Sequence, residues 1–573
     1  MIQLISLFSE LILKYLIFYL FLFLLGRSFI LIIQILLFKT KNLPEEIFKI
    51  KSPIIYPVLG LVFLGNFLIL LNFFMPLKSP FVFIILFSLI FINFLNLNLK
   101  INFYNFFTLN NLLFYLVIPS ILIISSSTTN FHYDAGYYHL NHQNWLRESN
   151  LIIGMVNIFW PFGMSSINEY ISAFFWFDSS FILLHFLTLF FIHFFFIFIS
   201  YNLLSTKNKN LKAASFFLLF FSFLDNFGAS GGRNGFPYIQ GVGKQDIAVG
   251  VLFCFVSLII LNSVKQRKVR DIDFVLLSLL TFFIFQLKVS GVIVFFLYFV
   301  FCFFLINNQI FNLRNIVYFQ IPSVIFGVVW SIKSYLTTGC VIFPLSLSCI
   351  NNFDWYLPNS TKAYEEISTV SSLAYMEYFV DKNLTFVDWF NDFFLSQVYA
   401  DLALFYRSVY INFLISLIAI YLLKLVLFRK EPANRNFNLI VFIYLASSFL
   451  YLLFFGPIPR YAMGTLLTVV GIFGFYSKDK KYNLNKYFVY FLIIICVGLI
   501  PRANSYIEFI TNPQIAIFDP RLEELYIEEQ IHENWIRPDR GDRCWINLKC
   551  TMHKENIYIS EESFFKVAYR IKE

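Results

Sequence analysis

Long uninterrupted runs of apolar residues recur along almost the whole sequence. A run of about 17–25 such residues can cross the hydrocarbon core of a bilayer as a helix. The chain is 59% hydrophobic and 13% charged, with a mean hydropathy of +0.71, which is typical of polytopic membrane proteins. We therefore predict an all-α polytopic membrane protein with about fourteen transmembrane helices. They are expected at 10–38, 54–75, 80–97, 111–127, 181–203, 211–225, 246–263, 272–288, 290–306, 315–336, 403–428, 437–455, 459–476 and 486–501.

The first apolar run is interrupted by Arg27, so residues 1–38 can form one bent span or a hairpin of two. No small-residue cleavage site follows the run, which favours an uncleaved signal anchor.

The positions of the lysines and arginines predict the topology, because short loops rich in these residues stay on the cytoplasmic side. All five basic loops fall on one side when the spans between them are counted; they are 39–51, 205–212, 265–271, 429–435 and 478–486. The segments 128–180, 226–245, 337–402 and 502–573 then fall outside. We expect a bundle over 1–501 and a small extracytoplasmic C-terminal cap over 502–573, in which 519–536 has the pattern of a short amphipathic helix. The formal net charge of +9 follows from this topology, so we expect no nucleic-acid partner.

The seven cysteines agree with this topology. Cys254, Cys302 and Cys496 lie in predicted spans, where a reduced apolar thiol is ordinary. The other four lie outside as two close pairs, which makes them disulfide candidates. The pairs are Cys340 with Cys349 and Cys544 with Cys550.

The segment FHYDAGYYHLNHQNW (131–145) places a carboxylate in the first large outer loop. Helical spacing puts Tyr138, His142 and Trp145 on one stripe and His139 one turn from His142, which predicts an amphipathic helix on the bilayer surface. Asp134 has two interpretations at this point: it caps that helix, or it has a chemical function.

Four cations on the same side favour a function for this face. Arg233, Lys244, Lys288 and Arg460 all lie in outer segments, where the topology rule disfavours cations. Each alone can be a side chain that extends to the lipid headgroups. Together they favour an anionic ligand, since phosphate pairs well with Lys and Arg in a partly desolvated groove.

Two more familiar kinds of site are poorly matched. The segment GGRNGFPYIQGVGK (231–244) has Tyr238 where a phosphate-binding loop needs its first glycine, and Gln245 follows Lys244 in place of Ser or Thr. The three histidines of 131–145 can bind zinc only if Asp134 or Glu148 joins them. No cofactor is therefore assigned, although a divalent metal stays open.

Several short motifs resemble the GT-C glycosyltransferase-like membrane proteins of bacterial surface-polysaccharide loci, a largely uncharacterised group. The similar stretches are YDAGYYHL around Asp134, KVSG after Leu287, TTGCVIFP before Leu345, PIPRYAMG around Arg460, and CWINLKCT from Cys544. They span most of the chain, from about residue 50 onward.

This resemblance implies a transferase of the bacterial inner membrane that uses a polyprenyl-phosphate sugar donor and a glycan, lipid or protein acceptor at the outer face. Asp134 takes the place of the loop Asp that binds or deprotonates the acceptor hydroxyl, and Glu148 or Glu169 can be a second acid. Lys244, Lys288 and Arg460, followed by Arg233, are the candidates for the donor phosphate. Tyr138, His139 and His142 are candidate contacts of the acceptor or the loop.

Two other classes compete with this interpretation. A surface-polysaccharide polymerase or ligase would use a large outer loop with Arg and His, but NNFDWYLPNSTKAYEE (351–366) has neither. A transporter of lipid-linked sugars would concentrate its charges at the middle of broken spans, whereas the ionisable residues here lie near the outer helix ends.

Overall fold

The computed structural model describes residues 2–95, 108–126, 131–176, 180–226, 241–350, 353–372, 400–432, 434–455, 458–479, 507, 527–531, 535–538, 542–553, 556–561 and 564–571. Arg233 and Cys496, together with the predicted span 486–501, lie outside the described residues.

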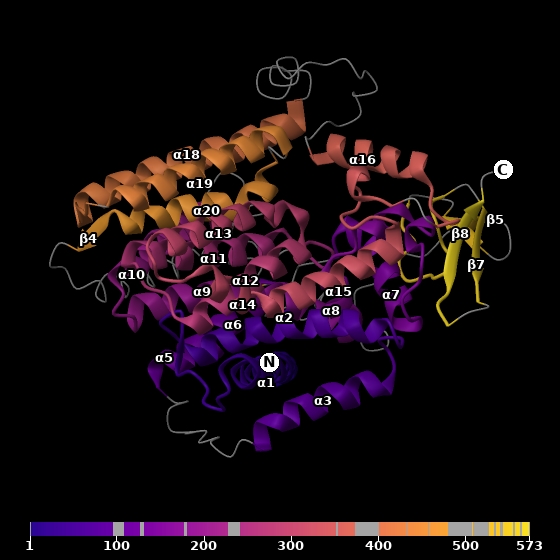
Figure 1. The fold of residues 1–573 in the computed structure, drawn as a ribbon, viewed down its shortest axis with the longest axis horizontal. Helices are drawn as coiled ribbons and strands as arrows, with labels where there is room; N and C mark the ends of the chain where they lie inside the picture. Colours follow the sequence, from indigo (N-terminus) through magenta and orange to yellow (C-terminus); the bar gives the residue numbers. More distant parts are fainter. Residues whose placement is uncertain are drawn as a thin grey trace.

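The described chain is mostly helical, as predicted (Figure 1). The longer helices are α1 (Ile2–Phe38), α2 (Ser52–Asn72), α3 (Pro80–Leu95), α9 (Ile182–Leu204), α10 (Lys209–Asn226), α11 (Asp246–Gln266), α12 (Asp271–Leu287), α13 (Val292–Asn307), α15 (Ile321–Thr338), α16 (Pro358–Ser372), α18 (Ala400–Leu427), α19 (Arg435–Phe455) and α20 (Pro459–Phe475). The shorter ones are α5 (Leu109–Leu112), η1 (Leu113–Val117), α6 (Ile118–Ser125), η2 (Ala135–His139), α7 (Leu140–Glu148), η3 (Met155–Asn157), η4 (Trp160–Met164), α8 (Ile167–Phe175), η5 (Val289–Gly291), α14 (Leu313–Phe319) and η6 (Ser346–Ser348).

Among the described residues, seven helices are long and apolar enough to cross a membrane, or up to eight if the bent pair α14 and α15 is one span. The chain is therefore a multi-pass membrane protein. Helices α12 and α20 have 17 residues each, and at 1.5 Å per residue they are about 25 Å long, which is short for a full crossing. The larger number of spans stays a prediction. Residues 2–38 form one continuous helix, so the hairpin alternative is not what the chain adopts.

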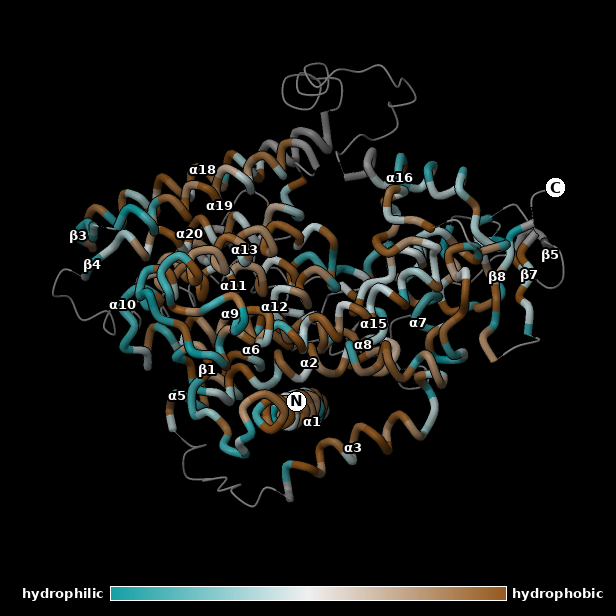
Figure 2. The backbone as a smooth tube through the Cα atoms, viewed as in Figure 1, coloured by the Kyte–Doolittle hydropathy of each residue, from teal (hydrophilic) through white to brown (hydrophobic). Residues whose placement is uncertain are grey.

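Several helices begin at a residue that favours a helix N-terminus, either a capping side chain or a proline. The side chain of Ser166 accepts a hydrogen bond from the backbone N–H of Asn168 and begins α8, and Asn312 does the same for Asn315 at α14. Proline occupies one of the first two positions of α2, α15 and α20, where its missing N–H costs no helical hydrogen bond. The long apolar helices pack around one large hydrophobic core, and Figure 2 shows their predominantly apolar course.

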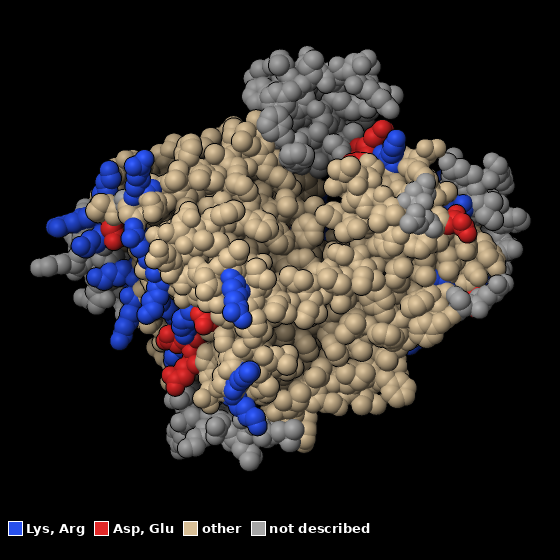
Figure 3. All heavy atoms as spheres, viewed as in Figure 1, with Lys and Arg blue, Asp and Glu red and all other residues tan. Residues whose placement is uncertain are grey.

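The basic loops meet at one end of the bundle, as Figure 3 shows for the Lys and Arg side chains near α10 and β4. Strands β1 (Glu46–Ile47) and β2 (Ile50–Lys51) pair in the first loop, and Arg270 of the third loop donates to the carbonyl of Glu46. Lys265 binds Asn210 of the second loop at 3.1 Å and Glu431 of the fourth at 3.0 Å. Strand β3 (Phe428–Lys430) pairs with β4 (Ser477–Asp479), which brings in the fifth. The predicted placement of all five basic loops on one side agrees with these contacts.

The C-terminal segment packs on the other end of the bundle. Its described strands are two antiparallel pairs, β5 (Ile527–Ile531) with β6 (Trp535–Pro538) and β7 (Asn556–Ser560) with β8 (Val567–Ile571). The amphipathic helix predicted over 519–536 is wrong for 527–531 and 535–536. These residues are strands because β5 and β6 pair with each other, and because Trp535 stacks near Trp145 with ring centroids 6.3 Å apart.

Candidate functional site

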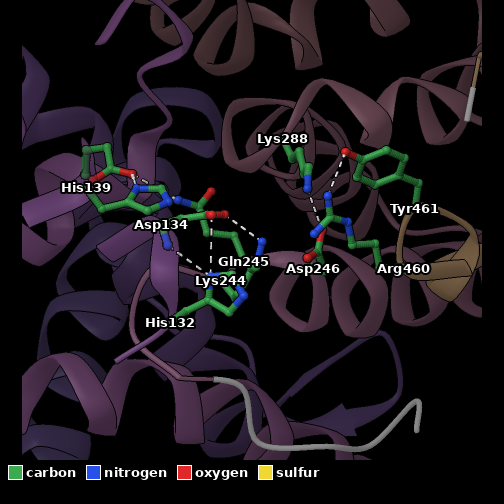
Figure 4. Close-up of polar contacts among 10 residues, drawn as sticks. His132, Asp134, His139, Lys244, Gln245, Asp246, Lys288, Arg460 and Tyr461 are labelled. Carbon is green, nitrogen blue, oxygen red and sulfur yellow. Dashed lines mark hydrogen bonds and ion pairs between the residues drawn. The ribbon is translucent and has the colours of Figure 1, made fainter. Parts of the chain in front are cut away.

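Asp134 lies between α6 and η2 and forms an ion pair with Lys244, which precedes α11. Lys244 Nζ is 2.6 Å from Asp134 Oδ2, and the two side chains are 13% and 25% exposed. His132 Nδ1 lies 3.5 Å from Asp134 Oδ1. Figure 4 shows these three side chains converging from two separate segments.

Asp134 is not a helix cap. It stands directly before η2, but its side chain makes no capping hydrogen bond to the helix. Burial alone would raise the pKa of Asp134, but the hydrogen bond with His132 and the charge of Lys244 outweigh it and lower that pKa. The carboxylate is therefore ionised at neutral pH.

The loop that carries Lys244 approaches the Asp134 segment very closely. Val242 O accepts a hydrogen bond from His132 N at 3.0 Å. Gly243 has φ of +94°, and a Cβ at this position would lie 2.8 Å from Ala135 N. Only glycine fits both requirements without strain. The backbone of this loop therefore fixes how Lys244 reaches Asp134.

A second ion pair lies beside the first, at the ends of α11, α12 and α20 (Figure 4). Lys288 Nζ is 2.5 Å from Asp246 Oδ1 and 4.4 Å from the centre of the Tyr461 ring. Arg460 donates to the hydroxyl of Tyr461 at 3.4 Å. The Asp246 side chain is only 1% exposed, whereas Lys288 is 32% exposed and so remains accessible.

The two pairs interact electrostatically. The pKa of Lys244 is lowered by burial and by the positive charge of Arg460, although Asp134 and Asp246 oppose this shift. Three cations and two carboxylates thus share one region: Lys244, Lys288 and Arg460 with Asp134 and Asp246. Counting only these five groups, one positive charge is left in excess, which suits an anionic ligand.

Glu169 of α8 forms a third, buried part of the site. Its carboxylate binds His139 Nδ1 at 2.6 Å, Gln143 Nε2 at 2.8 Å and Gln245 Nε2 at 3.1 Å. Burial would raise the pKa of Glu169, but the charge of His139 and its hydrogen bond lower it. Gln245 directly follows Lys244, so Glu169 helps to hold the loop that reaches Asp134.

The other candidate acid, Glu148, does not join this cluster. It binds Lys78 at 3.0 Å near the surface. Asp134 and Glu148 lie at opposite ends of the helical segment η2–α7, and 14 residues at 1.5 Å each place them about 20 Å apart. Glu148 is therefore too far from Asp134 to act with it.

The predicted surface helix is in fact buried on several sides. His139, His142 and Trp145 are buried, and Tyr138 lies against His139 with ring centroids 4.0 Å apart. His142 stacks on Phe162 at 5.0 Å, and burial lowers its pKa to about 3. The structure differs from the prediction because Phe162 of η4 and Glu169 of α8 cover the two histidines. Trp535 of the tail covers Trp145.

Metal binding has no support from the geometry of the described residues, since no three His, Cys, Asp or Glu side chains among them are arranged to hold an ion. In particular, His139 pairs with Glu169 and His142 stacks on Phe162, so these two rings have separate partners.

The two predicted disulfides are present. Cys340 is bonded to Cys349, and Cys544 is bonded to Cys550.

Sequence reasoning missed several members of the site, namely His132, Gln245, Asp246 and Tyr461. Asp246 is the first residue of an apolar span, so the apolar pattern does not single it out. The sequence feature that could have indicated its role is a carboxylate two residues after a lysine.

The sequence matches a family described as a domain of unknown function (DUF8201) over residues 10–467. The chain belongs to this family. The matched range contains Asp134, Glu169, Lys244, Asp246, Lys288 and Arg460. No curated protein and no solved structure matches the chain. The family assignment supplies no activity.

Proposed function

We propose that this DUF8201 chain is a GT-C-type membrane glycosyltransferase. It would move a sugar from a polyprenyl-phosphate-linked donor to a glycan, lipid or protein acceptor at the outer face of the bacterial inner membrane. One observation carries the proposal: an ionised carboxylate, Asp134, lies paired with Lys244 beside two further cations, Lys288 and Arg460.

Two features support an outer position for this site. The site lies away from the end of the bundle where the five basic loops meet, and basic loops stay cytoplasmic. Both disulfides belong to segments at the site's end, since Trp545 beside Cys544 binds Gly136 and the N–H of Gly154 donates to Leu336 near Cys340. Disulfides persist in oxidising compartments. About fourteen spans would be consistent with this arrangement.

The chemistry needs a proton acceptor and a site for a leaving phosphate. The acceptor hydroxyl oxygen forms a bond to the anomeric carbon while the bond from that carbon to the phosphate oxygen breaks. The bonding electron pair leaves with the phosphate, and the hydroxyl proton passes to the Asp134 carboxylate. A positioned carboxylate contributes about 10²–10⁴-fold to such a step.

Lys244 links the two halves of this reaction. In the structure it neutralises Asp134 and keeps the pKa of that carboxyl low, which makes Asp134 a weak base. A donor phosphate that draws Lys244 away would leave Asp134 more basic. The base would then gain strength when the donor is bound.

Lys288 and Arg460 would hold the donor phosphate. Loss of one charged hydrogen bond costs about 1.5–3 kcal/mol, so Lys288→Ala and Arg460→Ala should each weaken donor use by about 10–150-fold.

The test uses purified full-length protein in nanodiscs. The donor source is a membrane-lipid extract of a strain that lacks the gene, and the acceptor is the surface glycan of that strain; mass spectrometry reports added sugar. Lys265→Ala is the matched control, because Lys265 is also a mostly buried, ion-paired lysine but lies at the other end of the bundle. Normal transfer by both Lys288→Ala and Arg460→Ala would contradict the donor assignment. A deletion strain whose surface glycan, lipids and proteins carry unchanged sugars would contradict the transferase.

A further inference from the structure

A disulfide-closed loop of the C-terminal segment is fastened to the chain that carries Asp134. The loop runs over 542–551 and is closed by the bond between Cys544 and Cys550. Trp545 N–H donates to Gly136 O at 2.9 Å. Asn144 Nδ2 donates to Ile546 O at 2.8 Å, so the loop follows η2 and α7. Its position relative to Asp134 is therefore fixed by several bonds.

The loop places two charged side chains around an exposed aromatic ring. The Tyr133 side chain is the exposed member of the Asp134 segment, at 44%. Its hydroxyl donates to the carboxylate of Asp542, and Arg543 Cζ lies 4.8 Å from the centre of its ring. Tyr137 stacks next to Tyr133 with ring centroids 5.9 Å apart and planes at 27°. We call these four residues the tyrosine rim.

The tyrosine rim has the chemistry that recognises a sugar ring. The C–H face of a pyranose is apolar and packs on an aromatic face, while its hydroxyl groups need donors and acceptors around the edge. Asp542 supplies acceptors and Arg543 supplies donors. Because Arg543 lies over the Tyr133 ring and Tyr137 stacks beside it, a pyranose would reach the aromatic face by displacing the guanidinium, which could then donate to the sugar hydroxyl groups. Tyr137 lies three residues after Asp134, on the same face of the helix, and the charges of Asp134 and Asp542 both act on its hydroxyl. A sugar on the rim would therefore have a hydroxyl near the Asp134 carboxylate.

The two histidines predicted to contact the acceptor are less suitable for that role. His139 and His142 are buried. His139 is occupied by Glu169, and His142 by its stacking on Phe162. They position the segment that carries Asp134, whereas the tyrosine rim offers the accessible surface.

We propose that the tyrosine rim is the acceptor subsite and that the acceptor is a saccharide chain, an inference that rests on the proposed transferase function. The C-terminal loop thus completes the site by supplying Asp542 and Arg543, both of which lie beyond the residues matched to the family. The donor is held by the cations on the other side of Asp134, and the acceptor by the rim.

The binding test uses the full-length protein and, as probe, the surface glycan purified from the strain that lacks the gene. Tyr133→Ala and Arg543→Ala should each weaken binding of this glycan about tenfold, as expected for loss of an aromatic or charged contact. Tyr133→Phe, which keeps the ring, should bind within about threefold of wild type. Tyr558→Ala is the matched control, because Tyr558 is a 43% exposed tyrosine elsewhere on the same C-terminal segment.

The transfer assay separates this inference from the proposed function. Rim variants should raise the KM for the glycan and leave kcat nearly unchanged, whereas Asp134→Asn should lower kcat. If Asp134→Asn abolishes transfer but Tyr133→Ala and Arg543→Ala leave both glycan binding and KM unchanged, the acceptor subsite is overturned and the transferase stands. If glycan binding depends on Tyr133 but the wild-type protein transfers no sugar, the transferase fails while the saccharide site stands. Failure of the wild-type protein to bind the glycan overturns the subsite.

Discussion

Lys244 Nζ lies 2.6 Å from Asp134 Oδ2 although 110 positions separate the two residues. A bond over this separation can form only when the loop before α11 is folded against the segment before η2. The pair therefore ties two outer loops together and keeps a carboxylate ionised between them. Asp134 thus has a structural role and a proposed catalytic role, which makes it the most informative residue to substitute.

Asp134→Asn should reduce sugar transfer by about 10²–10⁴-fold, because the amide keeps the shape of the carboxylate but cannot accept the proton. The measurement is turnover in nanodiscs, with membrane level and melting temperature compared with wild type. Asn at this position leaves Lys244 without its partner, so the double variant Asp134→Asn with Lys244→Gln restores charge balance. Its stability should recover while its transfer stays low; activity within a few-fold of wild type in Asp134→Asn would remove the catalytic role.

Reporter fusions should place the site on the periplasmic side of the membrane. A reporter that is active only in the periplasm should give signal when fused after Asn150 and none when fused within 265–271. The reason is that the basic loops meet at one end and the Asp134 segment lies at the other. The opposite pattern would put Asp134 in the cytoplasm and contradict the donor assignment.

Acidification should destabilise the protein partly through His142. Its pKa is about 3 in the folded state, because of burial, against 6.5 when free. The unfolded chain then binds the extra proton between these values, so stability falls as pH drops below 6.5, by about 2 kcal/mol at pH 5. His142→Phe keeps a ring against Phe162 and should show a smaller drop in melting temperature between about pH 7.5 and pH 5. An identical drop in both proteins would exclude a contribution from His142.

Gly136→Ala should loosen the C-terminal loop. A Cβ at Gly136 would lie 2.9 Å from Trp545 Cε2 and 3.0 Å from Arg543 Cδ, so the loop must shift. Limited proteolysis should cut the tail faster in this variant. Gly327→Ala is the control, since its Cβ would meet only Phe282 at 3.7 Å; equal cleavage in the two variants would show that the contact at Gly136 does not hold the loop.

Peptide mapping without reduction should recover Cys544 joined to Cys550 and Cys340 joined to Cys349. The short loop from Cys544 to Cys550 contributes about 2–3 kcal/mol by chain entropy, so Cys544→Ser should free the tail locally and leave the bundle folded. Free thiols at all four positions in protein from intact cells would argue against an oxidising compartment.

The sequence was sufficient to predict which segments lie at the same end of the bundle. Apolar run length predicted the helices, and the count of spans between lysine-rich loops put Asp134, Lys244, Lys288 and Arg460 at one end. Topology cannot predict which residues touch, because pairing depends on helix register and loop path. Asp246 was missed for this reason, because the apolar pattern of a span does not predict that its first residue contacts Lys288.

Local sequence patterns predicted the structure less well where the same residue spacing is compatible with two different structures. Asp134 precedes a helix and so had the pattern of a cap, yet its side chain turns to Lys244 because that loop lies against it. Residues 527–531 and 535–536 have a helical pattern but pair as strands, since partners in the tail and Trp145 decide the outcome. Glu148 and Glu169 are both acids near the same helix, and only burial against His139 distinguishes them.

Asn141 bonds to the carbonyl of Asn547 across 406 positions of the chain, which sets an order of events during biosynthesis. A ribosome adds the Asp134 segment early and the loop that covers it only near the end of translation. Nascent chains would therefore hold an incomplete site in the membrane for most of their synthesis, with Tyr133 still lacking its contacts with Asp542 and Arg543. A truncated product that lacks 542–551 would still insert its helices but would have no finished site, so the proposed activity would require chains whose C-terminal segment has folded back onto the Asp134 segment.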